Sequence, residues 1–237
     1  MVDVSIARPL NMPAYVARPD GDGPWPGVVV VSDVLGMTAD LRRQADWLAS
    51  EGYLAIAPDL FFRGNRAACL KAIFQDAARG SGRTFDDIGA ARTWLSDQDD
   101  CTGRIGVIGF CLGGGFALLL APSGDYGAAS VNYGRLPRDL ERFLDGACPV
   151  IGSYGGKDLS LRGAAHKLER ALTVAGVDHD VKEYPDAGHS FLDDHRPEDL
   201  PRLLVVMVRV TGARYHEPSA ADARNRITAF FDRHLRD

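Results

Sequence analysis

The stretch GFCLGGG at residues 109–115 lies between two apolar runs, RIGVIG at 104–109 and GGFALLLA at 114–121. The first run is typical of a buried strand and the second of a helix packed against a sheet. A residue between them must turn the chain sharply, and the small glycines around it permit such a turn. We therefore expect the Cys111 thiol to point out from the end of a strand, where chemistry can take place.

The composition is that of an ordinary soluble globular protein. Apolar residues make up 46% of the 237 residues and charged residues 25%, which is enough for a sizeable core. The formal net charge of −5 argues against a nucleic-acid partner, because phosphate binding needs a basic face. The longest apolar run, LLVVMV at 203–208, is far too short to span a bilayer, so no membrane partner is expected.

The cysteines and the N-terminus bear on the compartment and on cofactors. None of the four cysteines stands in a CxxC or Cys/His ligand spacing, so we expect no zinc and predict neither a metal nor a cofactor. So few cysteines in a chain of this length fit a reducing compartment. The start, MVDVSIARPLNMPAY, lacks the apolar core of a signal peptide. We expect a cytoplasmic protein, monomeric or homodimeric, with a small-molecule partner.

Apolar runs alternate with amphipathic ones along the chain. VSIA and PAYVARP can pair as an N-terminal hairpin, and the runs typical of strands that follow are 27–32, 53–58, 104–110, 128–133, 149–155 and 179–185. Besides the helix after Cys111, the segments typical of helices are 39–51, 85–97, 160–175 and 219–236. Uninterrupted apolar strands indicate burial on both faces. The chain is therefore predicted to be one α/β domain, a mostly parallel sheet with helices on both faces.

Reactive residues follow four of the predicted strands. Asp33 comes after the first buried strand and Cys111 after the third. Asp158 follows the fifth strand and His189 the last. The carboxyl ends of parallel strands meet at one edge of a sheet, which is where ligands bind. Nucleophile, acid and histidine occur in the chain order of the α/β-hydrolase triad, and GFCLG at 109–113 has the form of a nucleophile elbow.

The chemistry of a thiol hydrolase gives each of these groups a predicted role. A cysteine thiol needs a neighbouring base or a helix N-terminus to form the thiolate, and His189 can accept its proton. Asp158 would orient the imidazole and stabilise the imidazolium, with Asp186 as a competing candidate for that acid. The backbone N–H groups of Leu112 and Val34 would form the oxyanion hole.

On these motifs the sequence resembles the dienelactone hydrolase family, cysteine-dependent members of the α/β-hydrolase fold. The matching stretches run through most of the chain: VVVVSDVLGM, LASEGYLAIAPDLFFR, RIGVIGFCLGGGFAL, GGKD and YPDAGHSF. The resemblance implies one α/β-hydrolase domain over residues 1–237. It also implies the catalytic set, a triad of Cys111, Asp158 and His189 with Val34 and Leu112 as the oxyanion hole.

Two positions depart from the pattern of that family. The family carries an acid, usually Glu, after the first buried strand, where it contacts the resting nucleophile; this chain has the shorter Asp33 there. Well-studied members bind the substrate carboxylate through arginines, one of them four residues after the histidine, where this chain has Asp193. The resemblance therefore implies a hydrolase but leaves its lactone or ester substrate open.

Further side chains are candidates for substrate binding or for tuning the thiol: Asp33, Arg66, Tyr133 and Ser190. Each has a plainer alternative. Asp33 could cap the helix at 39–51, Tyr133 could pack in the core, and Ser190 could cap its own turn. Arg66, like its neighbour Arg63, could lie on solvated surface. His195 is ambiguous between a surface residue and a functional one.

Three classes of function remain open for this chain. The first is a thiol-dependent hydrolase of lactones or small activated esters that works through an acyl-thioester on Cys111. The second is a redox-sensitive thiol protein, and the third is a noncatalytic binding module on the same fold. The presence of both Asp158 and His189 favours the first, because binding alone would need neither.

The segment at 196–218 is additional material between His189 and the last predicted helix. Its central LLVVMVRV is apolar on almost every side, so it cannot lie free in water. We expect either a lid over the pocket, formed by Leu203, Leu204 and Met207 among others, or a plainer role. The plainer roles are a buried helical turn, an added strand or an oligomer contact.

Overall fold

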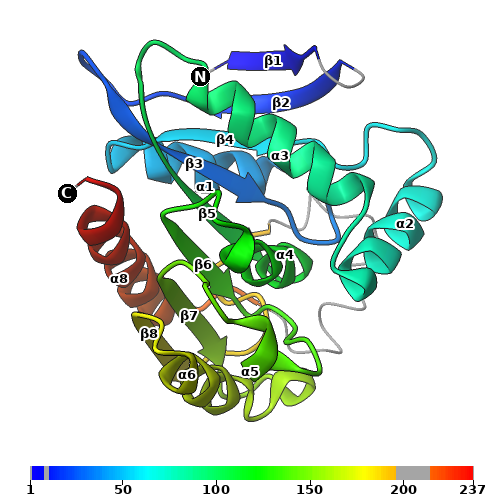
Figure 1. Cartoon of the computed structure of the whole chain (residues 1–237), viewed down its shortest axis with the longest axis vertical. Coiled ribbons are helices and arrows are strands. Elements are labelled where there is room, and N and C mark those ends of the chain that lie inside the picture. The colour runs from blue at the N-terminus through cyan, green and yellow to red at the C-terminus, as the bar shows by residue number, and fades with distance from the viewer. Residues whose placement is uncertain (1, 8–10, 196–213, 237) are drawn as a thin grey trace.

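An eight-stranded sheet forms the centre of the computed structural model, which describes residues 2–7, 11–195 and 214–236. The strands lie in the order β1-β2-β4-β3-β5-β6-β7-β8 (Figure 1). Their bounds are β1 Val2–Ile6, β2 Met12–Ala17, β3 Trp25–Val31, β4 Leu54–Pro58, β5 Cys101–Phe110, β6 Ala128–Asn132, β7 Val150–Gly155 and β8 His179–Tyr184. The pairings among β3 to β8 are parallel, and β1 and β2 add an antiparallel edge. The predicted mostly parallel sheet with an N-terminal hairpin is confirmed.

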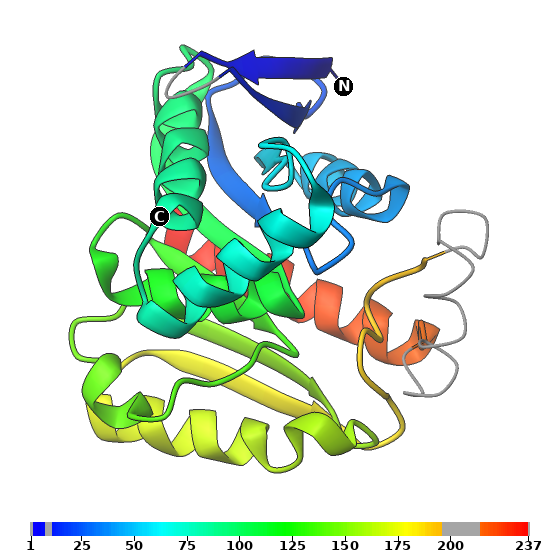
Figure 2. The same ribbon diagram turned by 90° about the vertical axis from the view of Figure 1, so that its right-hand side faces the viewer.

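Helices cover both faces of this sheet (Figures 1 and 2). One face packs against α1 (Ala39–Ser50) and α8 (Glu217–Leu235). The other face packs against α2 (Arg66–Arg79), α3 (Arg83–Ser96), α4 (Leu112–Leu120), α5 (Leu140–Phe143) and α6 (Ala164–Ala175). In β3, Val29 and Val31 enter one core cluster while Val28 and Val30 enter the other. Because each face of the strand is buried, the run is apolar throughout.

The order of the strands reverses beside β3. From β3 the chain moves outward to β4, and it then returns to the opposite side of β3 as β5, with Val31 paired to Gly109. Such a reversal leaves a crevice at the carboxyl ends of the two strands on either side of it. Asp33 and Cys111 follow these two strand ends, so the topology itself places them at one location.

The structure differs from the sequence prediction at three helices, one of which is the short α5, which was not predicted. The α2 helix was not predicted, because its buried residues are Ile73 and Asp76 alone and they leave no apolar stripe in the sequence. The helix predicted at 160–175 begins only at Ala164, since Leu159–Leu161 forms a separate 3-10 turn.

Within the described residues, no helix is both long enough and apolar enough to cross a membrane. Of the segment at 196–218 the structure describes only 214–218, where α8 begins at Glu217. The predicted lid or oligomer contact falls on 196–213, outside the described residues, and stays a prediction.

The turn from β5 into α4 packs so closely against neighbouring backbone that its glycines could not carry side chains. A Cβ atom on Gly109 would lie 1.9 Å from the carbonyl oxygen of Gly113, and one on Gly113 would lie 2.2 Å from that of Val31. Close-packed interiors contain no contacts of this kind between carbon and backbone oxygen. Glycine at these positions therefore allows α4 to begin directly over the ends of β3 and β5.

Gly113→Ala is expected to lower the free energy of unfolding by about 2 kcal/mol or more, because the added methyl group meets backbone that cannot move aside. Gly115→Ala is the matched control, since a Cβ there has its nearest neighbour 3.6 Å away, at the Arg135 carbonyl oxygen. Inside a helix this second change stabilises by up to about 1 kcal/mol. Urea unfolding measures both, and equal destabilisation by the two variants would contradict the steric argument.

Candidate active site

Cys111 occupies the turn between β5 and α4 and is partly buried. Its backbone has φ of 53° and ψ of −112°, a conformation that L-residues adopt only under strain. Its N–H donates a 3.0 Å hydrogen bond to the carbonyl of Asn132 at the end of β6, which holds the turn in place. This is the arrangement that the glycine-rich motif predicts for a nucleophile elbow.

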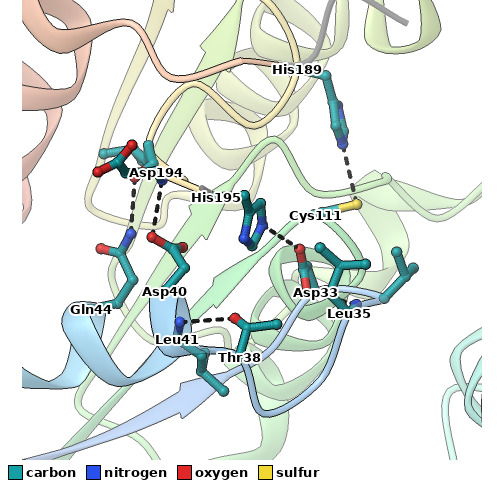
Figure 3. Close-up of polar contacts among 12 residues, drawn as sticks. Asp33, Leu35, Thr38, Asp40, Leu41, Gln44, Cys111, His189, Asp194 and His195 are labelled. Atoms are coloured by element: carbon teal, nitrogen blue, oxygen red, sulfur yellow. Dashed lines mark hydrogen bonds and ion pairs between the residues drawn. The ribbon is translucent and has the colours of Figure 1, made fainter. Parts of the chain in front are cut away.

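His189 lies between Cys111 and Asp158. The His189 Nε2 is 3.1 Å from the Cys111 Sγ, a contact that Figure 3 shows, and the Nδ1 is 2.6 Å from the Asp158 Oδ2. Asp158 follows β7 and is almost fully buried, and its Oδ1 accepts hydrogen bonds from the N–H and the hydroxyl of Ser160. Thiol, imidazole and carboxylate thus form one continuous chain of contacts.

Asp186, the competing candidate for the acid, lies away from this chain of contacts. Its exposed carboxylate is 3.2 Å from the Lys157 ammonium. The spacing of Asp158 and His189 instead follows from the backbone, since a Cβ on Gly155 would lie only 2.3 Å from the carbonyl oxygen of Gly188. The turn after β7 therefore packs directly on the loop that carries the histidine.

Hydrogen bonds decide the protonation of this pair. Burial alone would lower the pKa of His189, but the hydrogen bonds to Asp158 and Cys111 outweigh it and raise the pKa to about 10. Burial would likewise raise the pKa of Asp158, but hydrogen bonds with His189 and Ser160 hold it below its ordinary value. At neutral pH an ionised carboxylate therefore supports a protonated imidazole that faces the sulfur.

The predicted oxyanion donors belong to the two segments that meet at the crevice. Leu112 is the first residue of α4, so its N–H has no partner within the helix. Val34 lies in the turn after β3, which a 3.3 Å hydrogen bond from the Gly36 N–H to the Asp33 carbonyl closes. Exposed Arg66 donates a 3.0 Å hydrogen bond to the Val34 carbonyl, which places a cation beside this turn.

Asp33 is directed at His195 rather than at the sulfur, as Figure 3 shows. Its Oδ2 is 3.0 Å from the His195 Nε2, and its Oδ1 accepts a 2.7 Å hydrogen bond from the Leu35 N–H. Asp33 also does not cap α1, because Thr38 does so through the Leu41 N–H. The sequence left the role of His195 ambiguous, because 162 residues separate it from Asp33 and no local sequence motif predicts their contact.

Tyr133 and Asp193 are buried next to the histidine loop. The Tyr133 ring meets the His189 ring edge-on, with centroids 5.3 Å apart. Asp193 is 4% exposed, and burial together with the nearby carboxylates of Asp40 and Asp33 raises its pKa. A carboxyl group thus occupies the position where the resemblance implies a substrate-binding arginine.

Ser190 shapes the turn that follows His189. It has φ of 57°, in the left-handed region, and its carbonyl accepts a 3.0 Å hydrogen bond from the Asp193 N–H. The turn directs the chain back toward α1, where the side-chain amide of Gln44 donates to the Leu192 carbonyl at 2.9 Å. The loop after the histidine is therefore fastened to the helix that follows Asp33.

The sequence and the fold have counterparts in known proteins. The sequence model of the dienelactone hydrolase family matches residues 12–235. The chain belongs to the dienelactone hydrolase family. Members of this family are hydrolases, so the chain is a hydrolase. The match confirms the resemblance and, with the structural comparison, the fold that the sequence predicted.

Individual members of this family resemble the chain over most of its length. A Yersinia pestis protein provisionally named carboxymethylenebutenolidase is 33% identical over 242 residues, spanning 94% of this chain and 84% of the relative. The carboxymethylenebutenolidase of Pseudomonas putida is 29% identical over 188 residues, or 75% of this chain and 79% of that protein. A Klebsiella pneumoniae crystal structure, provisionally named dienelactone hydrolase, superposes with a TM-score of 0.79 at 31% identity and 97% coverage of both chains.

His189 is expected to keep its ring proton up to a pH near 10, because Asp158 and the sulfur stabilise the imidazolium. Its folded pKa lies above the unfolded value of about 6.5, so its contribution to stability is complete below that pH. The contribution is lost as the pH rises through the folded value. Nitrogen NMR of the ring between pH 6 and 11 measures the midpoint.

The control variants separate the carboxylate from general charge effects. Asp158→Asn is expected to lower the titration midpoint of His189, whereas Asp186→Asn leaves it unchanged because that carboxylate pairs with Lys157. A wild-type midpoint near 6.5, or an equal effect of both variants, would contradict the assignment.

Proposed function

We propose that the protein hydrolyses lactones or small activated esters, with Cys111 as the nucleophile and an acyl-thioester as the intermediate. The observation that carries this proposal is the contact chain from the Cys111 Sγ through His189 to Asp158, at a strained turn between strand and helix. A cysteine that merely filled space would need neither partner. The names of the relatives, carboxymethylenebutenolidase and dienelactone hydrolase, agree with a lactone substrate.

In the proposed reaction the sulfur attacks the substrate carbonyl carbon, and negative charge develops on the carbonyl oxygen. The N–H groups of Leu112 and Val34 donate to that oxygen, and each such donor contributes roughly 3–4 kcal/mol to the transition state. When the tetrahedral intermediate collapses, the ester C–O bond breaks and His189 gives its Nε2 proton to the leaving oxygen. The acyl group stays on Cys111 as a thioester.

Water completes the proposed cycle. His189, now neutral, takes a proton from a water molecule whose oxygen attacks the thioester carbonyl. The C–S bond breaks, the carboxylic acid leaves, and the imidazole faces the sulfur again. Asp158 keeps the Nδ1 proton in place throughout, so Nε2 is the nitrogen that gives and takes protons.

We assign substrate selection to Arg66 and a supporting role beside the imidazole to Tyr133. Arg66 lies exposed against the Val34 carbonyl, where a carboxylate on the substrate would meet a cation close to the oxyanion donors. Arg63 is less suited, because its guanidinium is held by the buried Asp87. The buried Tyr133 ring packs edge-on against the imidazole and helps to hold it in place, and Ser190 directly follows His189 in the chain.

A redox-sensitive thiol is the second candidate, and two of the other three cysteines support it poorly. Burial raises the pKa of Cys148 to about 12 and also raises the pKa of Cys101, so neither thiol readily forms the thiolate that a disulfide partner needs. All four cysteines are free, which suits the reducing cytoplasm in which we place the protein.

Cys111→Ala is expected to lower kcat for an activated ester or an unsaturated lactone at least about a thousandfold, because no other group can form the acyl intermediate. Cys69→Ala is the matched control and should keep wild-type turnover. Intact-mass spectrometry of a rapidly quenched reaction should detect the acyl adduct on the wild type and not on Cys111→Ala. Undiminished turnover by Cys111→Ala would overturn the mechanism.

His189→Ala is expected to lower kcat more than Asp158→Asn, and both should lose at least about a hundredfold. Loss of His189 removes the proton carrier, while loss of Asp158 only weakens its orientation and charge. Asp186→Asn should retain wild-type kcat, since its side chain is exposed and bonded to Lys157. Steady-state kinetics of the three variants test the order, and a larger loss for Asp186→Asn would reverse the assignment of the acid.

A further inference from the structure

A small cavity lies beside the active site, between the turn after β3, the start of α1 and the loop after His189. Its polar lining includes Asp33, Asp40, Asp193 and His195. The three carboxylates are 9%, 2% and 4% exposed, respectively. Buried carboxylates are stable only with a positive partner or with hydrogen-bond donors, so each of these three carboxylates needs such a partner.

Two of the three acids have partners. Asp40 accepts a 3.0 Å hydrogen bond from the Asp194 N–H and lies 3.3 Å from the Arg43 guanidinium. Asp33 faces His195, as described above and shown in Figure 3. These contacts fasten the loop after His189 to α1 and to the turn after β3.

Asp193 is the exception among the three. Its Oδ2 atom is fully buried and, within the described part of the chain, makes no hydrogen bond of good geometry, although the buried Tyr133 hydroxyl interacts with the same carboxyl group. The Nδ1 atom of His195, which lines the same cavity, is also buried without a partner there. A buried polar atom without a good hydrogen bond destabilises the folded protein, so a ligand that satisfies these atoms would bind favourably.

We propose that Asp33, Asp193 and His195 bind one divalent transition-metal cation in this cavity, at a site separate from the cysteine and histidine of the proposed hydrolysis. One ligand atom from each of the three residues lies within 4.8 Å of the others. The Asp33 Oδ2 and the His195 Nε2 are 3.0 Å apart, the spacing of two donors about 2.1 Å from one ion at roughly a right angle.

The third ligand needs only a small adjustment. Two donors on one ion lie at most about 4.2 Å apart, twice a bond of about 2.1 Å. A separation of at most 4.8 Å closes to that limit when one ligand atom moves by a fraction of an ångström. Asp193 can make that movement, because its interaction with the Tyr133 hydroxyl lacks good hydrogen-bond geometry.

The donor set indicates the class of ion. Imidazole nitrogen is a preferred ligand of transition metals, and two carboxylates add hard oxygen donors, which together suit Mn²⁺ or Zn²⁺. The cation takes the place of the proton that His195 shares with Asp33 and of the proton that the raised pKa keeps on Asp193, and both protons leave to solvent. Two carboxylates then balance the double charge of the ion.

The ligands come from both walls of the active site. Asp33 belongs to the turn that carries Val34, while Asp193 and His195 lie four and six residues after His189. A bound cation would therefore link the oxyanion turn to the loop of the histidine and hold both in register.

The test measures Mn²⁺ binding to the whole protein at neutral pH, after EDTA treatment and dialysis. Binding is monitored as the loss of the electron paramagnetic resonance signal of free Mn²⁺. We expect one Mn²⁺ per chain, displaced by equimolar Zn²⁺. Asp193→Asn and His195→Gln should each weaken the Kd for Mn²⁺ at least about tenfold. Circular dichroism without metal checks that each variant folds. If Asp193→Asn does not fold, the Kd of His195→Gln for Mn²⁺ tests the proposal.

Two control variants locate the site. Cys111→Ala should keep the wild-type Kd for Mn²⁺, which separates this cavity from the sulfur. Asp186→Asn removes an exposed acid near the same loop and should also keep it. Failure of the wild type to bind either ion, an unchanged Kd in the folded ligand variants, or a weakened Kd in Cys111→Ala overturns the proposal. Because the readout is binding, none of these outcomes alters the case for the hydrolase.

Discussion

The contact between the backbone of Gly113 and the carbonyl oxygen of Val31 governs the geometry of the site. A Cβ atom at Gly113 would lie 2.2 Å from that oxygen, so the approach is possible only because the residue has no side chain. It lets α4 begin over the ends of β3 and β5, where the strand order reverses. This close approach brings the strained turn at Cys111 and the first residue of α4, Leu112, next to the turn after β3.

Features with local causes could be predicted from the sequence. The apolar run of β3 reflects burial of each successive valine, and GFCLG at 109–113 encodes the sharp turn in its glycines. The grouping of Cys111, Asp158 and His189 could also be anticipated, because parallel strands bring their carboxyl ends to one edge. The α2 helix could not be predicted in this way, because Ile73 is its one buried apolar residue and a periodic pattern needs several apolar residues.

The acid-lined cavity could not have been predicted, and the reason is physical. Ligand-spacing rules detect donors that are neighbours in the chain, whereas 162 residues separate Asp33 from His195. The burial of Asp193 depends on the path of the loop after Ser190, which the backbone turn and the Gln44 hydrogen bond determine. Asp33 and Asp193 stood out in the sequence as departures from the family pattern, but only the fold showed that both lie beside His195.

The charges around the site constrain how a substrate can enter it. Buried carboxylates at Asp33 and Asp193 draw in positive charge, either as the His195 proton or as the proposed cation, so this wall presents little net charge to a ligand. Arg66, by contrast, is exposed and bonded through a neutral carbonyl, so its charge stays available. In the proposed hydrolysis, a carboxylate on the substrate would therefore be directed to the Arg66 side of the crevice. The leaving oxygen would face the His189 Nε2, and these two requirements together would orient the scissile carbonyl over the sulfur.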